Sequence, residues 1–147
     1  MKKRVISLIL MALCAALLLS ACTIIKEPEN LKADLESLGY SPKLYSSTDT
    51  ANYSSLANLF ELDSTEGVYN ILIVDGGADK DTAKPLIVFF CSSKAVTDRV
   101  FEDVKDSLDT FVSVTGLASV EDCNLTKVDN TVIVGHPDMI KIAKAGF

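Results

Sequence analysis

The chain has 147 residues, of which 20 are acidic and 14 are Lys or Arg, and its formal net charge is −6. This length suits one domain with a single core. The acidic balance argues against nucleic acid or an anionic membrane surface as a partner, because both require clustered basic side chains.

The N-terminus has the layout of an export signal. Met1-Lys2-Lys3-Arg4 is positively charged, and the apolar stretch from Val5 to Leu18 is shorter than the ~20 residues of a usual membrane span. Leu19-Ser20-Ala21-Cys22 follows and resembles the lipobox of bacterial lipoproteins. The resemblance implies cleavage between Ala21 and Cys22 and attachment of diacylglycerol to the Cys22 thiol. A plain signal peptide or membrane anchor with a chance cysteine is the alternative.

Lipidation of Cys22 predicts an anchor in the lipid bilayer on the extracytoplasmic face of the cell membrane. Thr23 follows the cysteine where an aspartate could stand, which favours the outer membrane if the organism has two membranes. Loss of the signal peptide, residues 1–21, leaves 11 basic and 20 acidic residues, a net charge of −9. Residues 22–29 are then the lipidated N-terminus and a short linker, and residues 30–147 are a single α+β domain. Thr23 to Glu27 can reach at most ~17 Å, so the domain is expected close to the bilayer.

The first half of the mature chain is predicted to contain two helices and an edge strand. Pro28 begins an amphipathic helix that carries Leu31, Leu35 and Leu38 and stops at Gly39. A short strand over residues 40–46 contains a proline, which confines it to a sheet edge or a strand start. Asp49 caps a second helix. Its inner face is expected to consist of Tyr53, Leu56, Leu59 and Phe60.

Two runs of β-branched and aromatic residues, Val68 to Val74 and Leu86 to Cys91, predict strands. The second run is apolar at six consecutive positions, so both of its faces should be covered. A helix over residues 95–114 follows, with Ser92 or Ser93 as its cap. Strands over 125–128 and 131–135 then form a hairpin around Asp129-Asn130, and a last helix runs from Pro137 through Ala145.

The order of these elements predicts an α+β fold with a mainly antiparallel sheet. It resembles a ferredoxin-like βαββαβ core with extra N- and C-terminal helices. Helices over 50–61 and 95–114 should cover one sheet face, and the terminal helices part of the other. The first strand departs from that fold, in which it is central, because it is short and contains Pro42. An open antiparallel sheet with another strand order is the alternative.

The segment from Val128 to Lys144 resembles the C-terminal part of small uncharacterised lipoproteins from gut-type Gram-positive bacteria. In these a tight hairpin leads into a glycine and a closing helix. The resemblance covers a short segment and implies no known activity.

Cys91 and Cys123 are the cysteines that follow Cys22. In an exported protein they could form a disulfide, or they could remain two unlinked thiols, with Cys91 as a small core residue. Redox or metal use is a third and weaker interpretation. The single histidine, His136, lies where a helix begins, and the sequence offers no short metal-ligand spacing around it.

No motif in the chain indicates a catalytic, cofactor or metal site. A Gly-x-Ser-x-Gly elbow and both glycine-rich phosphate loops are missing. The loop over 75–81 has three Asp residues, which could bind calcium, but a lysine lies among them and a solvated hairpin loop is the stronger interpretation. We therefore expect no cofactor and no enzymatic activity.

The sequence favours a membrane-anchored lipoprotein that acts as a non-catalytic interaction module at the cell envelope. A homodimer or an envelope protein is the expected partner. The alternative is a lipoprotein that binds a small ligand in an apolar pocket. A hydrolase or a redox enzyme is the third hypothesis.

Overall fold

The computed structural model describes residues 27–75, 83–115, 117 and 119–145. The signal segment, Cys22 and the 75–81 loop after Asp75 lie outside these residues, so the predictions made for them stay predictions. The elements, in chain order, are α2 (Pro28–Ser37), β1 (Pro42–Ser46), α3 (Thr50–Leu59), β2 (Val68–Val74), β3 (Leu86–Cys91), α4 (Lys94–Asp106), α5 (Leu108–Thr115), the 3₁₀ turn η1 (Val120–Asp122), β4 (Asn124–Val128), β5 (Thr131–Gly135) and α6 (Pro137–Lys144).

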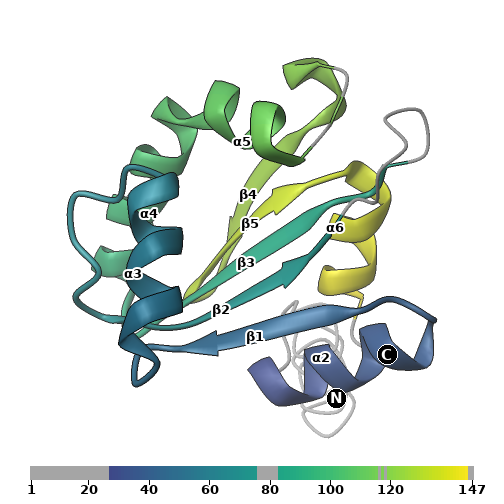
Figure 1. Ribbon diagram of the computed structural model, residues 1–147, viewed down its shortest axis with the longest axis horizontal. Helices are drawn as coiled ribbons and strands as arrows, with labels where there is room; N and C mark the ends of the chain where they lie inside the picture. Colours follow the sequence, from purple (N-terminus) through teal and green to yellow (C-terminus); the bar gives the residue numbers. More distant parts are fainter. Residues whose placement is uncertain (1–26, 76–82, 116, 118, 146–147) are drawn as a thin grey trace, which may run out of the picture.

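The strands form one five-stranded sheet in the order β1-β2-β3-β5-β4, and every neighbouring pair is antiparallel (Figure 1). The predicted α+β class is confirmed. The ferredoxin-like strand order is not confirmed, because β1 lies at the edge of the sheet beside β2. Pro42 is compatible with this position, because a proline has no N–H group to donate and is therefore confined to edge strands or to the first residue of a strand. The sheet is the open antiparallel alternative.

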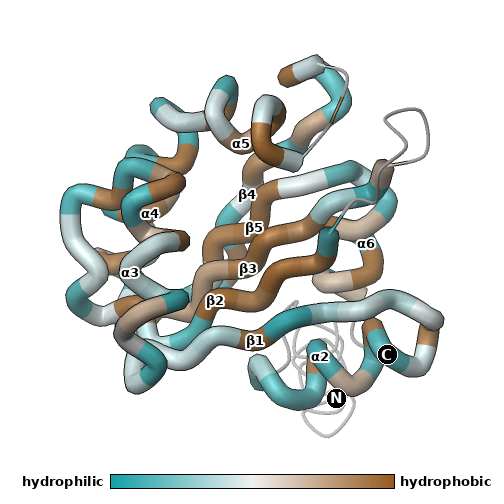
Figure 2. The backbone as a smooth tube through the Cα atoms, in the orientation of Figure 1, coloured by the Kyte–Doolittle hydropathy of each residue, from teal (hydrophilic) through white to brown (hydrophobic). Residues whose placement is uncertain are grey.

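Helices cover both faces of the sheet, and each face has its own apolar cluster. We name them the α3–α5 cluster, on the face covered by α3, α4 and α5, and the α2–α6 cluster, on the opposite face. β3 is buried at all six positions and contributes alternate side chains to the two clusters. Figure 2 shows the apolar strands in the middle of the molecule. The prediction that the terminal helices cover the second face is confirmed.

The helix at the start of the domain ends one residue before the last member of its predicted apolar stripe, Leu38. Leu31 and Leu35 are fully buried, but Leu38 is 49% exposed. Helix α2 stops at Ser37, and Gly39, with φ 88°, turns the chain towards β1, so Leu38 leaves the buried face. The helix begins at Pro28, as predicted from the sequence.

The single helix predicted over 95–114 is in fact two helices, α4 and α5. Ser107 lies between them with non-helical backbone angles and is buried. Its hydroxyl lies 3.0 Å from the Phe60 carbonyl oxygen and 2.9 Å from that of Asp103. The first contact ties the break to the end of α3. At the other end of α4 the Ser93 hydroxyl accepts a hydrogen bond from the Val96 amide, as its predicted role as a cap requires.

The hairpin and the closing helix agree with the sequence prediction. Val128 pairs with Thr131, and Asp129 takes the left-handed φ of 49° that a two-residue turn needs. Gly135 ends β5 with φ 152°, and a Cβ there would lie 2.3 Å from the Pro85 carbonyl oxygen. Glycine is therefore required for β5 to approach the start of β3.

Candidate functional site

A cleft of about 220 Å³ opens between α3 and α5 over the sheet. We call it the α3–α5 cleft. Its walls are apolar, and two oppositely charged side chains, Lys43 and Asp75, lie among its lining residues. The remaining lining residues are Tyr45, Leu56, Leu59, Phe60, Ile73, Ile87, Val114 and Thr115.

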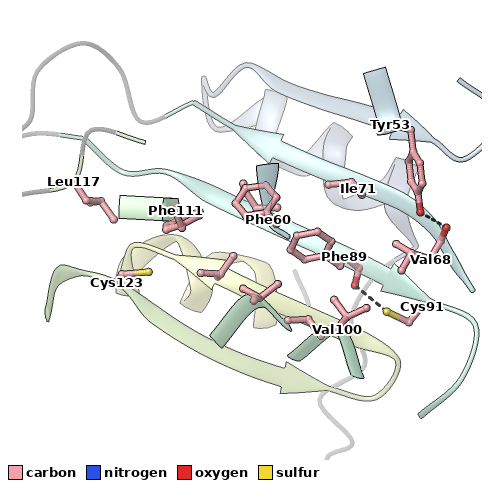
Figure 3. Packing of buried hydrophobic residues seen from close by; sticks show 14 residues of the cluster. Tyr53, Phe60, Val68, Ile71, Phe89, Cys91, Val100, Phe111, Leu117 and Cys123 are labelled. Carbon is pink, nitrogen blue, oxygen red and sulfur yellow. Dashed lines mark hydrogen bonds between the residues drawn. The ribbon is translucent and has the colours of Figure 1, made fainter. Parts of the chain in front are cut away.

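Aromatic packing holds the inner wall of the cleft. The Phe60 ring meets the Phe89 ring edge-on at a centroid distance of 5.6 Å, and the Phe111 ring lies 6.1 Å from Phe60 (Figure 3). These three fully buried rings join α3, β3 and α5. Val114, one turn beyond Phe111 on α5, is 49% exposed, and Leu59 on α3 is 36% exposed. The cleft is therefore a continuation of the α3–α5 cluster towards solvent.

The charged groups of the cleft are only loosely paired. Lys43 Nζ lies 3.9 Å from Asp75 Oδ2, and both side chains are mostly exposed. An exposed pair of this kind contributes little to stability, so both groups can change partner without cost to the fold. Other pairs are held more tightly. Lys127 and Lys94 both contact Asp98 and hold the pKa of its carboxyl below the usual range.

Cys91 and Cys123, the cysteines among the described residues, are free and lie at opposite ends of the sheet (Figure 3). Cys91 is the last residue of β3. Cys123 lies near the first residue of β3, because the next residue, Asn124, pairs with Gly135, and Gly135 pairs with Leu86. The first and last residues of β3 are about 17 Å apart along the strand, whereas the Cα atoms of a disulfide must lie within ~7 Å of each other. Of the sequence alternatives, the structure has two unlinked thiols.

Burial disfavours the thiolate form of both cysteines. It raises the pKa of Cys123 to about 11 and also raises the pKa of Cys91. A thiol that stays protonated is a poor nucleophile and a poor metal ligand. Among the described residues, no group of three or more His, Cys, Asp or Glu side chains is arranged to hold a metal ion.

His136 acts at the start of α6, as its position in the sequence indicated. Its Nδ1 accepts a hydrogen bond of 3.2 Å from the Asp138 amide. The Cys123 thiol contacts its neighbouring Asn124 carbonyl at 3.9 Å instead of the imidazole. Among the described residues, neither thiol is hydrogen-bonded to the His136 imidazole, the contact by which a thiol hydrolase activates its cysteine.

No family model matches this chain. Comparison with curated proteins and with solved structures gives no match either. In the part of the chain that the structure describes, no helix is long and apolar enough to span a bilayer. The proposal for its function therefore depends on the geometry of the cleft and on the predicted export signal.

Sequence reasoning did not identify the cleft. It placed Leu59 on the inner face of a helix and ended the next long helix at Val114, but it did not predict that the two residues would face one opening. The signal in the sequence that could have indicated the cleft is an excess of apolar side chains. Near their C-terminal ends, α3 and α5 carry more apolar side chains than a single buried stripe needs.

Proposed function

We propose that this protein is a lipid-anchored lipoprotein of the bacterial cell envelope and that its domain is a non-catalytic interaction module. In this proposal the α3–α5 cleft receives an apolar side chain of a partner protein. The cleft is the observation that carries the proposal for the domain. The lipobox-like sequence around Cys22 carries the proposal for the anchor.

The volume of the cleft favours a side chain over a whole ligand. Sites for small molecules usually measure ~300–1,000 Å³, whereas an engineered cavity of ~150 Å³ is enough to bind benzene. A cleft of about 220 Å³ therefore has room for one aromatic or branched aliphatic group. Single apolar anchors of this size often supply much of the binding energy of a protein interface.

The character of the reactive side chains supports a non-catalytic role. Both thiols are buried and have a raised pKa, and the His136 imidazole is engaged in capping α6. None of these groups lines the α3–α5 cleft. A partner bound there would meet apolar walls and the exposed Lys43 and Asp75, which suits recognition rather than bond cleavage.

A titration of methyl NMR signals with N-acetylphenylalanine amide and N-acetylleucine amide tests the cleft. We expect saturable shifts at the methyl groups of Leu59, Ile73, Ile87 and Val114. Val114→Lys should abolish them, because it places a charge in the opening. Leu38→Lys is the matched control, since Leu38 has the same exposure of 49% and lies outside the cleft. Shifts that survive Val114→Lys, or that occur only outside the cleft, would contradict the proposal.

The same titration separates the proposal from the small-ligand alternative. A panel of small carboxylic acids and amines that binds the cleft clearly more tightly than either amide would favour a small-ligand-binding lipoprotein. In that case Lys43→Ala or Asp75→Ala should weaken binding of one charge class selectively.

Metabolic labelling of intact cells with an alkyne-bearing fatty acid tests the anchor. The parent protein should be labelled, and Cys22→Ala should not be, because the thiol that accepts diacylglycerol is missing. Cys14→Ala is the matched control and should stay labelled, since Cys14 lies in the segment that is removed. An unlabelled parent protein would disprove lipidation.

A further inference from the structure

The register of the strands defines two ends of the sheet. One end contains Val68, Cys91 and Thr131, and the other contains Val74, Leu86 and Gly135. We call them the Thr131 end and the Gly135 end. Because β2 rises ~3.4 Å per residue over Val68–Val74, the two ends are about 20 Å apart.

The chain enters the domain at the Thr131 end. Glu27, the residue before α2, lines a small hollow of about 180 Å³ together with residues of the Thr131 end. Tyr69, which is 40% exposed and contacts the Phe90 ring, also lines this hollow. In the sequence, four residues separate Glu27 from Cys22. In the proposed lipoprotein the anchor would therefore be attached within ~17 Å of Glu27, on the side of the Thr131 end.

The α3–α5 cleft lies towards the Gly135 end. Lys43 pairs with Ile73 near the start of β1, and Asp75 directly follows β2. Ile87 is the second residue of β3. These residues line the cleft, so its charged groups are separated from the point of chain entry by most of the length of the strands.

We infer that the α3–α5 cleft faces away from the bilayer and receives its partner from the aqueous side of the envelope. This inference rests on the proposed lipid anchor. The five residue steps from Glu27 back to Cys22 reach at most ~17 Å, which is less than the length of the sheet. The net charge of −9 in the mature chain opposes contact of the sides of the domain with anionic lipid headgroups. Partner proteins in the aqueous phase can therefore reach the cleft, whereas acyl chains of the bilayer cannot.

Energy transfer from single tryptophans to dansyl-labelled lipid headgroups tests the orientation. The chain has no Trp, so each introduced Trp is the only donor of its kind. Tyr69→Trp reports on the Thr131 end, and Val114→Trp reports on the cleft. Leu38→Trp reports on the face of the α2–α6 cluster, because Leu38 lies at the end of α2 that is remote from Glu27. Each variant is purified as the acylated mature protein and reconstituted in phosphatidylcholine vesicles.

We expect transfer from Tyr69→Trp to exceed that from Val114→Trp and Leu38→Trp at least twofold. If transfer from Val114→Trp equals or exceeds transfer from Tyr69→Trp, the cleft lies at the bilayer and the inference is overturned. High transfer from Leu38→Trp would also overturn it, since the domain would then lie on its α2–α6 face. Failure of the anchor itself is recognised earlier, because no acylated protein would be recovered, and it removes the basis of the inference.

Discussion

Glu61 adopts a backbone conformation that usually belongs to glycine. It follows the last residues of α3 with φ 51°, and the Leu62 amide donates to the Ala57 carbonyl at 3.0 Å. The Glu61 amide donates to the Asn58 carbonyl at 3.2 Å. This pattern is a Schellman motif, and α2 ends in the same way at Gly39. A left-handed conformation costs a residue with a Cβ ~1–2 kcal/mol, so α3 ends under local strain.

Glu61→Gly should raise the free energy of unfolding by up to about 1 kcal/mol, because the relief of strain exceeds the added entropy of the unfolded chain. Gly39→Ala is the reciprocal control and should lower it by about 1 kcal/mol. A Cβ at Gly39 would meet no atom within 4 Å, so this effect is conformational and not steric. Urea denaturation measures both. A stabilising Gly39→Ala would show that the left-handed positions carry no strain.

The buried Cys123 thiol should make the protein less stable in alkaline solution. Burial raises the pKa of its thiol from 9.0 to about 11, so the folded protein holds this proton more tightly than the unfolded chain. The contribution of this proton to the free energy of unfolding is complete below pH 9 and decreases as the pH rises towards 11. Urea midpoints measured from neutral pH to pH 11 should fall in this window, and Cys123→Ala should reduce the fall. Tyr53, whose pKa burial raises to about 12, adds a further loss above pH 10.

At the scale of elements, Ser107 decides how α4 and α5 are joined. Its hydroxyl contacts the Phe60 carbonyl, and its non-helical backbone lies between the end of α4 at Asp106 and the start of α5 at Leu108. Ser107→Ala should lower the free energy of unfolding by about 1–3 kcal/mol, because a buried carbonyl loses its partner. Ser55→Ala is the control, since the Ser55 hydroxyl is exposed and bonds only within its own helix. Equal effects of the two substitutions would mean that the contact with Phe60 contributes nothing.

The elements that the sequence predicts well are those with local signals. The apolar run of β3, the proline in β1 and the Asp129-Asn130 turn are each visible in a short window, and each has its predicted place. The break at Ser107 has no such signal, because its cause is a carbonyl 47 residues earlier in the chain. The cleft could not be predicted for the same reason. It exists only where the ends of α3 and α5 come together over β1, β2 and β3.

At the scale of the whole molecule, the sheet connects two apolar clusters into one folding unit. Leu35 belongs to the α2–α6 cluster and Phe111 to the α3–α5 cluster. Leu35→Ala and Phe111→Ala should each cost about 2–5 kcal/mol, because both side chains are fully buried. Each variant should still unfold in a single transition, since β3 supports both clusters. Non-coincident transitions by circular dichroism and tyrosine fluorescence would show that the faces unfold independently.

The double burial of β3 also affects the chain before it folds. Leu86–Cys91 is a six-residue stretch without a charge, rich in β-branched and aromatic residues, and such segments pair readily with copies of themselves. Lys84 and Pro85 precede it and Lys94 follows shortly after, and residues of these types limit the growth of aggregates. Loss of the helices from either face would expose one side of this strand. Destabilised variants of both clusters should therefore aggregate through the same segment rather than accumulate as soluble unfolded chains.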